Sequence, residues 1–245
     1  MISIVIPLYN EEENVELYPE RLFPVVDPII KKFGYSCEYI MVDDGSTDST
    51  QQRLREIGKT HPNVIVLSHE KNQGLGAALR TGFVHSKADL VITMDSDLTY
   101  QPQDIEILLD TFQKTNADCI SASPYREREH STRIDSQFRL FVSKSVNFSY
   151  RVLLPKSDIT CVSAIFRLYK SKALEGLTLE STDFNINAEI ISKLMLQGKS
   201  VIEVGVPLHE REYGESKLNV RKEIWNNLIV LWKIFKFRVF NIRWE

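Results

Sequence analysis

The chain has 245 residues, of which 43% are hydrophobic and 26% charged, a composition that excludes a disordered or fibrous protein. This length suits one large α/β domain or two small ones and can bury a sizeable core. The net charge of −3 excludes a globally basic protein, so we expect no nucleic-acid partner.

The cysteines and the first residues give expectations about the compartment. Cys37, Cys119 and Cys161 lie in apolar stretches without metal-ligand spacing, which favours reduced core thiols. The start, "MISIVIPLYNEEE", lacks the cationic region of a signal peptide, and no apolar run reaches the roughly 20 residues of a membrane-spanning helix. We therefore expect a reduced, cytoplasmic protein.

The first half of the chain alternates short apolar runs with amphipathic segments. The apolar runs are rich in Val and Ile and end in polar or turn residues, which is typical of buried strands. Strands are predicted at 2–8, 39–44, 64–69, 90–95 and 118–123, and helices near 11–33, 47–58, 74–86 and 102–115. This alternation predicts an α/β fold with a mostly parallel sheet and right-handed crossovers.

The pattern becomes irregular after about residue 124. The charged segment "PYREREHSTRIDSQ" is predicted to be a loop, and a helical pattern then runs to about Leu154. A strand near 162–170, a helix near 184–198, a strand at 200–208 and a long C-terminal helix follow. Without repeats or a low-complexity linker, we expect one domain over 1–216 and a helical segment over 217–245.

Three of the predicted strands end in polar clusters. These clusters are Pro7–Glu11, Asp43–Ser46 and Asp95–Asp97, and the carboxyl ends of parallel strands meet at one edge of a sheet, where ligands bind. A single Asp after a strand is commonly a helix N-cap, and Asp44 or Asp48 has that alternative. Three acidic clusters at one edge favour a ligand site.

The last of these clusters, in "VITMDSDLTY", suggests a metal. Asp95 and Asp97 are separated by one residue at the end of a buried strand, where two like charges repel. A divalent cation can remove that repulsion, and Mg²⁺ held by one or two carboxylates usually completes its shell with water and substrate phosphates. The pair therefore suits a metal that stabilises a departing diphosphate.

Several motifs together resemble a known family. "IPLYNEEENV", "VDDGSTDST", "KNQGLGAALRTGF" and "MDSDLTYQP" occur in the order and spacing of family 2 glycosyltransferases, which have the Rossmann-like GT-A fold. The later "REYGESKL" narrows the resemblance to the polyprenyl-phosphate sugar transferases. The likeness extends from Ile2 to about Leu218. It implies an α/β domain with helices around a mostly parallel sheet.

The resemblance also implies roles for the strand-end residues. Asp95 and Asp97 are the implied catalytic pair and the ligands of Mg²⁺ or Mn²⁺, with Asp97 as the principal ligand. Relatives place an assisting Gln two residues after the second Asp; here Thr99 stands there, so Gln101 or water could serve instead. The implied nucleotide-binding residues are Pro7, Tyr9, Glu11, Asp43, Asp95 and Ser96.

Four cations are candidates for phosphate or acceptor binding: Arg126, Arg139, Arg211 and Lys217. Arg211 and Lys217 match an Arg…Gly-x-Ser-Lys element of the family, and two cations around a glycine suit a loop that closes over phosphates. Arg126, or Arg128, could replace an Arg that many relatives have at the position of Pro124. The alternative for Arg126 and Arg128 is that each is a solvated cation of a loop. Arg139 could equally be a cation on the surface of a helix.

Two further segments leave alternatives open. "NQGLGAALRTG" contains part of a dinucleotide-binding fingerprint, but Leu79 stands where a Gly or Ala is required, so a tight turn with close helix packing is the preferred interpretation. Asp183 and Glu189 lie where relatives place acceptor-side carboxylates. Either could be a general base, or a helix cap and an exposed side chain.

The C-terminal segment "IWNNLIVLWKIFKFRVF" combines apolar residues at helical spacing with Lys and Arg. A basic amphipathic helix with Trp and Phe can lie in a membrane interface. The alternative is that its apolar face packs on the domain or on a partner. Both interpretations stay open, and the first of them makes a membrane surface an expected partner.

The predicted function is an inverting, metal-dependent glycosyltransferase that moves a sugar from a GDP- or UDP-sugar to a dolichyl or undecaprenyl phosphate. A carbohydrate or lipid hydroxyl acceptor is the alternative. "ITMDSDLT" also fits the nucleophile element of haloacid-dehalogenase-type phosphatases, but there it ends the first strand and precedes the acidic pair. A receiver-like binding domain would likewise need its acidic pair after the first strand.

Overall fold

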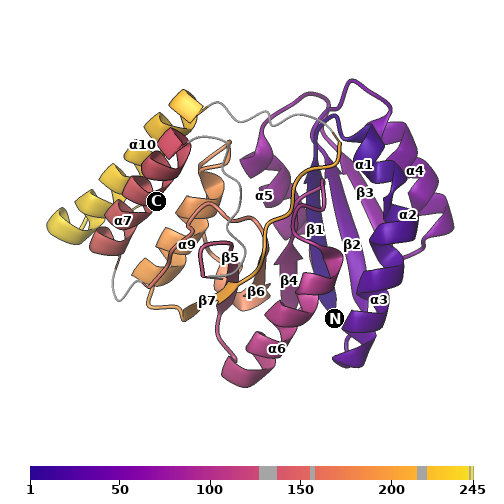
Figure 1. Cartoon of the computed structure of the whole chain (residues 1–245), viewed down its shortest axis with the longest axis horizontal. Coiled ribbons are helices and arrows are strands. Elements are labelled where there is room, and N and C mark those ends of the chain that lie inside the picture. Colours follow the sequence, from indigo (N-terminus) through magenta and orange to yellow (C-terminus); the bar gives the residue numbers. More distant parts are fainter. Residues whose placement is uncertain (127–136, 155–157, 214–219, 243, 245) are drawn as a thin grey trace.

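A mixed β-sheet with helices on both faces forms the fold (Figure 1). The computed structural model describes residues 1–126, 137–154, 158–213, 220–242 and 244, with side chains except at 137–144, 220, 221 and 223. Within these residues the sheet has seven strands in the order β3-β2-β1-β4-β6-β5-β7. They are β1 (Ile2–Leu8), β2 (Cys37–Asp43), β3 (Val64–Ser68), β4 (Leu90–Thr93), β5 (Cys119–Ser123), β6 (Arg167–Lys170) and β7 (Val201–Gly205).

Helices connect these strands and follow the last of them. They are α1 (Glu12–Glu16), α2 (Tyr18–Arg21), α3 (Phe23–Lys32), α4 (Thr50–Thr60), α5 (Leu75–His85), α6 (Ile105–Thr115), α7 (Gln137–Leu153), α8 (Ser171–Leu174), α9 (Ile186–Leu196) and α10 (Val220–Phe240), with a 3₁₀ turn η1 at Pro102–Asp104. No helix in the described ranges is long and apolar enough to cross a membrane.

The predicted α/β fold with a mostly parallel sheet is confirmed. β1 pairs in parallel with β2 and β4, β2 with β3, and β5 with β7. Only β6, among the described strands, runs antiparallel, between β4 and β5. Because β6 opposes both neighbours, β4 and β5 point the same way, so six of the seven strands present their carboxyl ends at one edge.

The helical stretch predicted over 11–33 is divided into three helices. Pro19 lies at the start of α2 and Pro24 at the start of α3. Proline lacks the N–H that a helix interior needs, but it fits the first turn, where that N–H has no partner. The prolines therefore restart the helix twice, and the resulting bends wrap α1–α3 along one face of the sheet.

A hydrophobic core lies on each face of the sheet. Ile2, Ile4 and Ile6 of β1 pack in one core with residues of α1–α4 and α6. Val5 of the same strand points into the other core, which α5, α7, α9 and α10 cover. Because helices cover both faces, the central strands are apolar at nearly every position, and the predicted buried strands follow from this.

Two glycines in helices provide a matched test of the packing. A Cβ at Gly82 in α5 would overlap Cγ1 of Val5 in the central strand, whereas a Cβ at Gly58 in α4 would lie 3.6 Å from the nearest side-chain atom, Cγ2 of Val66. Alanine is the better helix former by about 1 kcal/mol. Overpacking costs about 1–3 kcal/mol.

Gly82→Ala is therefore expected to lower the free energy of unfolding, because strand and helix must separate to admit the methyl group. Gly58→Ala is expected to leave it unchanged or raise it by up to about 1 kcal/mol. Urea unfolding of the two variants measures the difference. Equal stability of the variants would contradict the close approach of α5 to β1.

Candidate functional site

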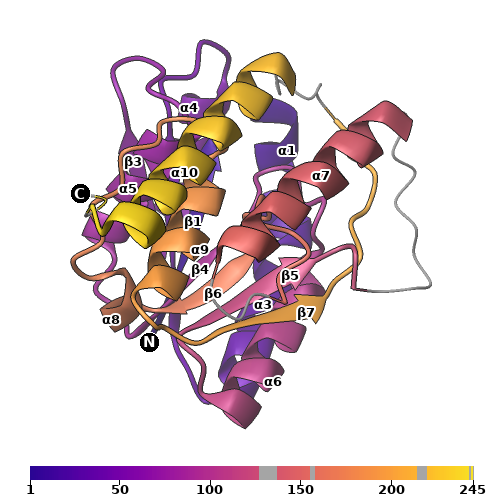
Figure 2. The same cartoon turned by 90° about the vertical axis from the view of Figure 1, so that its left-hand side faces the viewer.

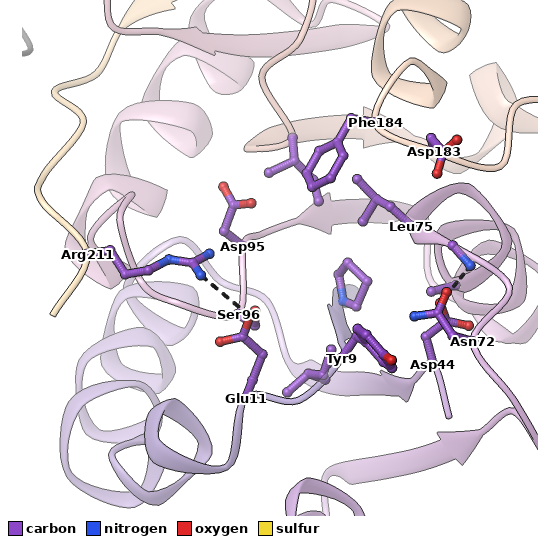
Figure 3. Close-up of a pocket in the computed structure, with 15 residues that line it drawn as sticks. Tyr9, Glu11, Asp44, Asn72, Leu75, Asp95, Ser96, Asp183, Phe184 and Arg211 are labelled. Atoms are coloured by element: carbon purple, nitrogen blue, oxygen red, sulfur yellow. Dashed lines mark hydrogen bonds and ion pairs between the residues drawn. The ribbon is translucent and has the colours of Figure 1, made fainter. Parts of the chain in front are cut away.

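The central strands β2, β1 and β4 bring the three predicted polar clusters together. From β1 the chain continues to β2 on one side, while β4 pairs with β1 on the other, so the strand order reverses at this point. A pocket of about 310 Å³ opens there, at the carboxyl edge (Figure 3). It is lined by Pro7, Leu8, Tyr9, Glu11, Asp44, Asn72, Gly74, Leu75, Ala78, Asp95, Ser96, Ile165, Asp183, Phe184 and Arg211.

The segment after β1 is held against the segment after β2 by reciprocal hydrogen bonds. The Asn10 side-chain oxygen accepts from the Thr47 N–H at 2.8 Å, and the Asn10 N–H donates to the Ser46 hydroxyl at 2.9 Å. Asn10 has a positive φ of 53°, a conformation that asparagine tolerates better than most residues. These contacts fix the direction in which Tyr9 and Glu11 leave the strand.

A buried tyrosine holds the backbone of the Asp95–Asp97 turn. The hydroxyl of Tyr18 in α2 donates to the Ser96 carbonyl at 2.7 Å. Burial, followed by the negative charge of Glu11, raises the pKa of Tyr18 well above its usual range, which keeps the donor protonated. On the other side, one oxygen of Asp97 accepts from both the N–H and the hydroxyl of Thr99, at 3.0 and 2.9 Å.

Arg211 supplies the positive charge next to this turn. Its Nε and Nη2 lie 2.7 and 2.5 Å from the second oxygen of Asp97. Its Nη1 lies 3.9 Å from the Glu11 carboxylate, and Figure 3 shows the guanidinium between Asp95 and Glu11. The predicted phosphate cation is therefore brought to the acidic pair, 114 residues away from Asp97 in the sequence.

Asp95 remains the less compensated member of the pair. Burial raises the pKa of the Asp95 carboxyl well above its usual range, and the neighbouring charge of Asp97 raises it further, while Arg211 opposes the shift. A negative charge is thus unfavourable at this position unless a cation comes closer. The carboxylate lines the pocket, where a ligand can reach it.

The carboxylates of Asp95 and Asp97 are of the ligand type that a hard divalent cation prefers. Asp95 and Asp97 contribute carboxylate oxygens, and the described residues contain no cluster of three or more His, Cys, Asp or Glu suited to a metal. Gln101, proposed as a replacement ligand, caps η1 and donates to the Leu98 carbonyl at 3.2 Å. A Mg²⁺ or Mn²⁺ here would take its remaining ligands from water and phosphate oxygens.

The acidic residue after β2 that reaches the pocket is Asp44. Asp43, which the family resemblance assigned to the base, is buried, with one oxygen accepting from the Ser46 N–H and the other without a hydrogen bond among the described residues. Asp44 accepts from the Gln73 and Gly74 N–H groups at 2.9 and 2.7 Å. These bonds anchor the segment that carries Asn72 into the pocket wall.

His69 extends this anchor into α5. Its Nδ1 lies 2.6 Å from Asp44 Oδ1, and its Nε2 lies 2.9 Å from the Thr81 hydroxyl. The imidazole therefore bridges the end of β2 and the helix that follows the glycine-rich segment. The preferred interpretation of that segment, a tight turn with close packing, holds for its glycines, but Asn72, Gly74 and Leu75 also line the pocket.

The segment 181–184 packs against α5 and contributes Asp183 and Phe184 to the pocket lining. The Gly76 N–H donates to the Thr182 carbonyl at 2.7 Å, and a Cβ at Gly76 would overlap the Ser181 carbonyl oxygen. This approach requires glycine, and it holds the segment of Asp183 and Phe184 at the pocket; in Figure 3 Asp183 lies on the far side from Asp95, with Phe184 between them. Asp183 is held by the Lys222 ammonium at 2.8 Å and the Asn226 amide at 3.3 Å.

Glu189 does not reach the pocket. It is fully buried in α9, its carboxylate accepts from the backbone N–H groups of Glu180 and Ser181, and it lies 3.1 Å from the Lys193 ammonium. Glu189 is therefore neither a pocket residue, as a general base would be, nor the exposed side chain that the sequence allowed as the alternative. It supports the pocket wall instead, because it orders the segment that leads to Asp183.

The remaining predicted cations lie elsewhere or outside the description. Arg126 donates to Glu203 at 3.1 Å and to the Asp158 carbonyl at 3.0 Å, and it does not line the pocket. Arg139 belongs to α7, but its side chain is outside the described part, and Arg128 and Lys217 are outside the described residues altogether.

Sequence reasoning did not assign roles to three residues. Asn72, within the glycine-rich segment, and Phe184, beside Asp183, both line the pocket. The buried Arg167 was also missed. It donates to the Ser121 hydroxyl and to the Asn187 and Val162 carbonyls, which ties β6 to the segments around it.

Comparison with protein families matches residues 3–178, more than seven tenths of the chain, to the family model described as "Glycosyl transferase family 2". A dolichol-phosphate mannosyltransferase of Pyrococcus furiosus is 33% identical over 242 residues, which are 96% of this chain and 64% of that protein. An undecaprenyl-phosphate 4-deoxy-4-formamido-L-arabinose transferase of Pectobacterium atrosepticum is 31% identical over 226 residues, 91% of this chain and again 64% of the relative.

Solved structures share the fold at lower sequence identity. Glucosyl-3-phosphoglycerate synthase from Mycobacterium tuberculosis, in complex with Mn²⁺, UDP and phosphoglyceric acid, aligns with a TM-score of 0.70 and 17% identity over 97% of this chain and 78% of its own. A mannosyltransferase from Pyrobaculum calidifontis with GDP-Man and Mn²⁺ aligns with a TM-score of 0.64 and 17% identity, over 100% of this chain and 65% of its own. The fold is thus of the GT-A type.

The charge balance of the Asp95–Asp97 turn generates a stability prediction. The raised pKa of Asp95 means that its charge opposes folding above the pKa of an unfolded Asp, about 3.9. Asp95→Asn is therefore expected to raise the transition temperature at pH 7. One kcal/mol corresponds to about 2–4 °C in a chain of this size. The gain should shrink as the pH falls and vanish below about pH 4, where the unfolded chain also binds the proton.

Asp97→Asn is the matched control, because it breaks the pair with Arg211 and is expected to destabilise the protein by about 1–3 kcal/mol. Thermal and urea unfolding from about pH 3.5 to pH 8 compares the two variants. A loss of stability in Asp95→Asn that is independent of pH would contradict the repulsion described for this carboxylate.

Proposed function

The chain belongs to glycosyl transferase family 2, and from the pocket at its sheet edge we propose that it transfers a sugar from a nucleotide-sugar to a polyprenyl phosphate, with inversion and with a divalent metal. One observation carries the proposal: Arg211, paired with Asp97, and Asp95 lie at one end of a pocket whose other end is lined by Tyr9, Asp44 and Asn72. The chain spans 64% of the length of the two curated relatives, so activity and substrates are proposals for the chain itself.

The donor's nucleoside is proposed to occupy the end formed by Tyr9, Asp44 and Asn72. Figure 3 shows these side chains on the side away from Arg211. The apolar side-chain atoms of Pro7 and Leu8 offer a surface for a planar base. The Asn72 amide offers a hydrogen-bond donor to the edge of that base, and the Asp44 carboxylate offers acceptors. The diphosphate then extends towards Asp95, which fits a GDP- or UDP-sugar.

The end of the pocket near Arg211 supplies positive charge at the place where the departing diphosphate would gain negative charge. Arg211 offers a planar set of N–H donors, which suits two phosphate oxygens as well as it suits the Asp97 carboxylate. Bound Mg²⁺ or Mn²⁺ would add Lewis-acid neutralisation of the same diphosphate. Complexes of the two solved relatives with Mn²⁺ support the metal, and Asp95 and Asp97 are the residues proposed to hold it.

The reaction is proposed to be a single in-line displacement. An oxygen of the acceptor phosphate forms a bond to the anomeric carbon as the bond from that carbon to the diphosphate breaks. The nucleoside diphosphate leaves with the electron pair, and the configuration at the carbon inverts. A phosphate is already anionic at neutral pH, so this attack needs no general base, whereas a hydroxyl acceptor does.

The polyprenyl-phosphate acceptor rests on the names of the curated relatives, a dolichol-phosphate and an undecaprenyl-phosphate transferase. Its phosphate would enter beside Asp183 and Phe184. The Lys222 ammonium at 2.8 Å from Asp183 provides positive charge at this wall. Such an acceptor is held in a bilayer, so the protein is proposed to work at a membrane surface.

Thermal unfolding with nucleotides tests the donor site. We expect GDP or UDP, but not CDP or dTDP, to raise the transition temperature when Mn²⁺ is present. Ligand at a hundred times its dissociation constant adds about 2.7 kcal/mol, a shift of several degrees for this chain length. Asp97→Asn, compared with its own ligand-free transition, should lose the metal-dependent part of the shift.

If none of the four nucleotides shifts the transition, the donor site is wrong. If the shift in Asp97→Asn equals that of the unmodified chain, the metal role of Asp97 is wrong while the nucleotide site stands.

Asp183→Asn distinguishes the two acceptor classes. With a phosphate acceptor we expect the rate of transfer to stay within about tenfold, because no proton has to be removed. A hydroxyl acceptor that relied on Asp183 would lose about 10²–10⁴ in rate. Transfer of sugar from a radiolabelled GDP- or UDP-sugar to undecaprenyl phosphate, and to a soluble sugar, measures both cases. A large loss with the lipid phosphate would contradict the base-free mechanism.

A further inference from the structure

Exposed hydrophobic side chains gather on the two helices at one end of the molecule. α7 and α10 lie side by side there, as both views show (Figures 1 and 2). Of the fifteen large hydrophobic side chains that are exposed among the described residues, nine belong to these helices or to the residues just after α10. They are Phe148, Val152, Trp225, Leu228, Ile229, Trp232, Val239, Phe240 and Ile242.

The inner face of α10 is already used by the fold. Val230, Leu231 and Ile234 are buried in the core on this side of the sheet. The hydroxyl of Tyr150 in α7 donates to the Asn227 side-chain oxygen of α10 at 2.9 Å, and that contact is buried. The packing of an apolar helix face on the domain, one of the two sequence interpretations, therefore accounts for the inner face only.

The outer face of α10 is apolar as well, which a domain helix does not require. Trp225 is 66% exposed and Trp232 54% exposed, and the spacing of seven residues places them on the same side of the helix. Surface helices normally present polar residues to solvent, and a contiguous exposed apolar patch on a soluble domain marks an interaction surface. Phe148 and Val152, four residues apart, are a second exposed apolar pair, on the neighbouring helix α7.

The charge around the patch selects the kind of partner. α7 and α10 together contain eight Lys or Arg and one Glu, in a chain whose net charge is −3. Arg151 and Arg238 are exposed beside the patch, and the Lys236 ammonium lies 5.5 Å from the centre of the Trp232 ring. Tryptophan with lysine and arginine around an apolar face is typical of helices that lie in the headgroup region of anionic membranes, whereas the core of a protein interface is depleted of lysine.

We propose that the outer faces of α7 and α10 form one docking surface for an anionic lipid bilayer, with both helices lying in the plane of the membrane. Neither helix has to cross the bilayer for this: the apolar side chains enter the headgroup boundary while the cations meet lipid phosphates. The proposal extends the C-terminal interface helix expected from the sequence to a surface of two helices, and it defines the residues that enter the lipid.

The surface also adjoins the pocket. Lys222 and Asn226, in the first turns of α10, hold Asp183 of the pocket wall at 2.8 and 3.3 Å. Docking would therefore bring that wall close to the headgroup layer, where the phosphate of a polyprenyl acceptor lies. This last consequence rests on the proposed function; the docking itself does not.

Flotation of the whole chain with vesicles tests the proposal. We expect the protein to float with vesicles of phosphatidylglycerol and phosphatidylcholine, to bind pure phosphatidylcholine vesicles less, and to dissociate as salt is raised. The double variant Trp225→Ser/Trp232→Ser should bind about tenfold or more weakly, because two large apolar groups no longer enter the lipid. Lys236→Gln/Arg151→Gln should weaken binding to the anionic vesicles only.

Val84→Ser is the matched control, because Val84 is also an exposed apolar residue, at 80% exposure, but lies on α5. It should float like the unmodified chain. All substituted side chains are exposed or half-buried and outside the pocket lining, so the unfolding temperature and the nucleotide-dependent shift should be retained and report a folded protein.

Absence of flotation with anionic vesicles, or equal flotation of the double tryptophan variant, would overturn the proposal. So would a stable dimer of the free chain that the double variant converts to a monomer, because a second copy would then be the occupant of this face. Flotation without any nucleotide-dependent stabilisation would leave the docking surface in place and refute the proposed donor site, so the two failures are distinguishable.

Discussion

Two carboxylates at the end of a buried strand need positive charge close by, and the architecture of the pocket follows from that need. Asp95 and Asp97 leave β4 together, and the pKa of Asp95 is raised by burial and by its neighbour. Arg211 contacts Asp97 at 2.5 Å and reaches towards Glu11, which brings the segment after β7 over the carboxyl edge of β1 and β4. The same guanidinium and the same carboxylates are the groups that a diphosphate and its metal would engage.

The walls of this pocket are held by backbone contacts that tolerate little change. Asp44 anchors Gln73 and Gly74 on one side, and His69 links that anchor to α5. On the other side α5 approaches residues 181–183 so closely that Gly76 admits no side chain. A nucleotide would therefore enter a preformed site, whose rigid walls limit the entropy lost on binding.

The C-terminal helix joins the pocket to the outer surface of the molecule. Its inner face completes a core, its first turns hold Asp183, and its outer face exposes Trp225 and Trp232. An apolar face that is not needed for folding exposes hydrophobic area to water, so its retention points to a partner that removes that area from water. For a protein whose proposed acceptor is a lipid phosphate, a bilayer is the partner that also brings the substrate.

The local sequence determined where the strands lie, which edge of the sheet carries the polar clusters, and where the acidic pair stands. Hydrophobic periodicity, strand length and strand-end residues each depend on only about ten consecutive residues. Hence β1–β5 and the meeting of three polar clusters at β2-β1-β4 were predicted from the sequence, and the family motifs gave Arg211 as a phosphate cation. Only the tertiary structure decided which side chain of a cluster lines the pocket: both Asp43 and Asp44 are buried, but only Asp44 belongs to the pocket lining, because successive residues of a strand end point to opposite sides. It likewise decided that β6 is antiparallel, that Glu189 is a buried support, and that α10 has two apolar faces with different surroundings, since each of these depends on contacts between residues far apart in the sequence.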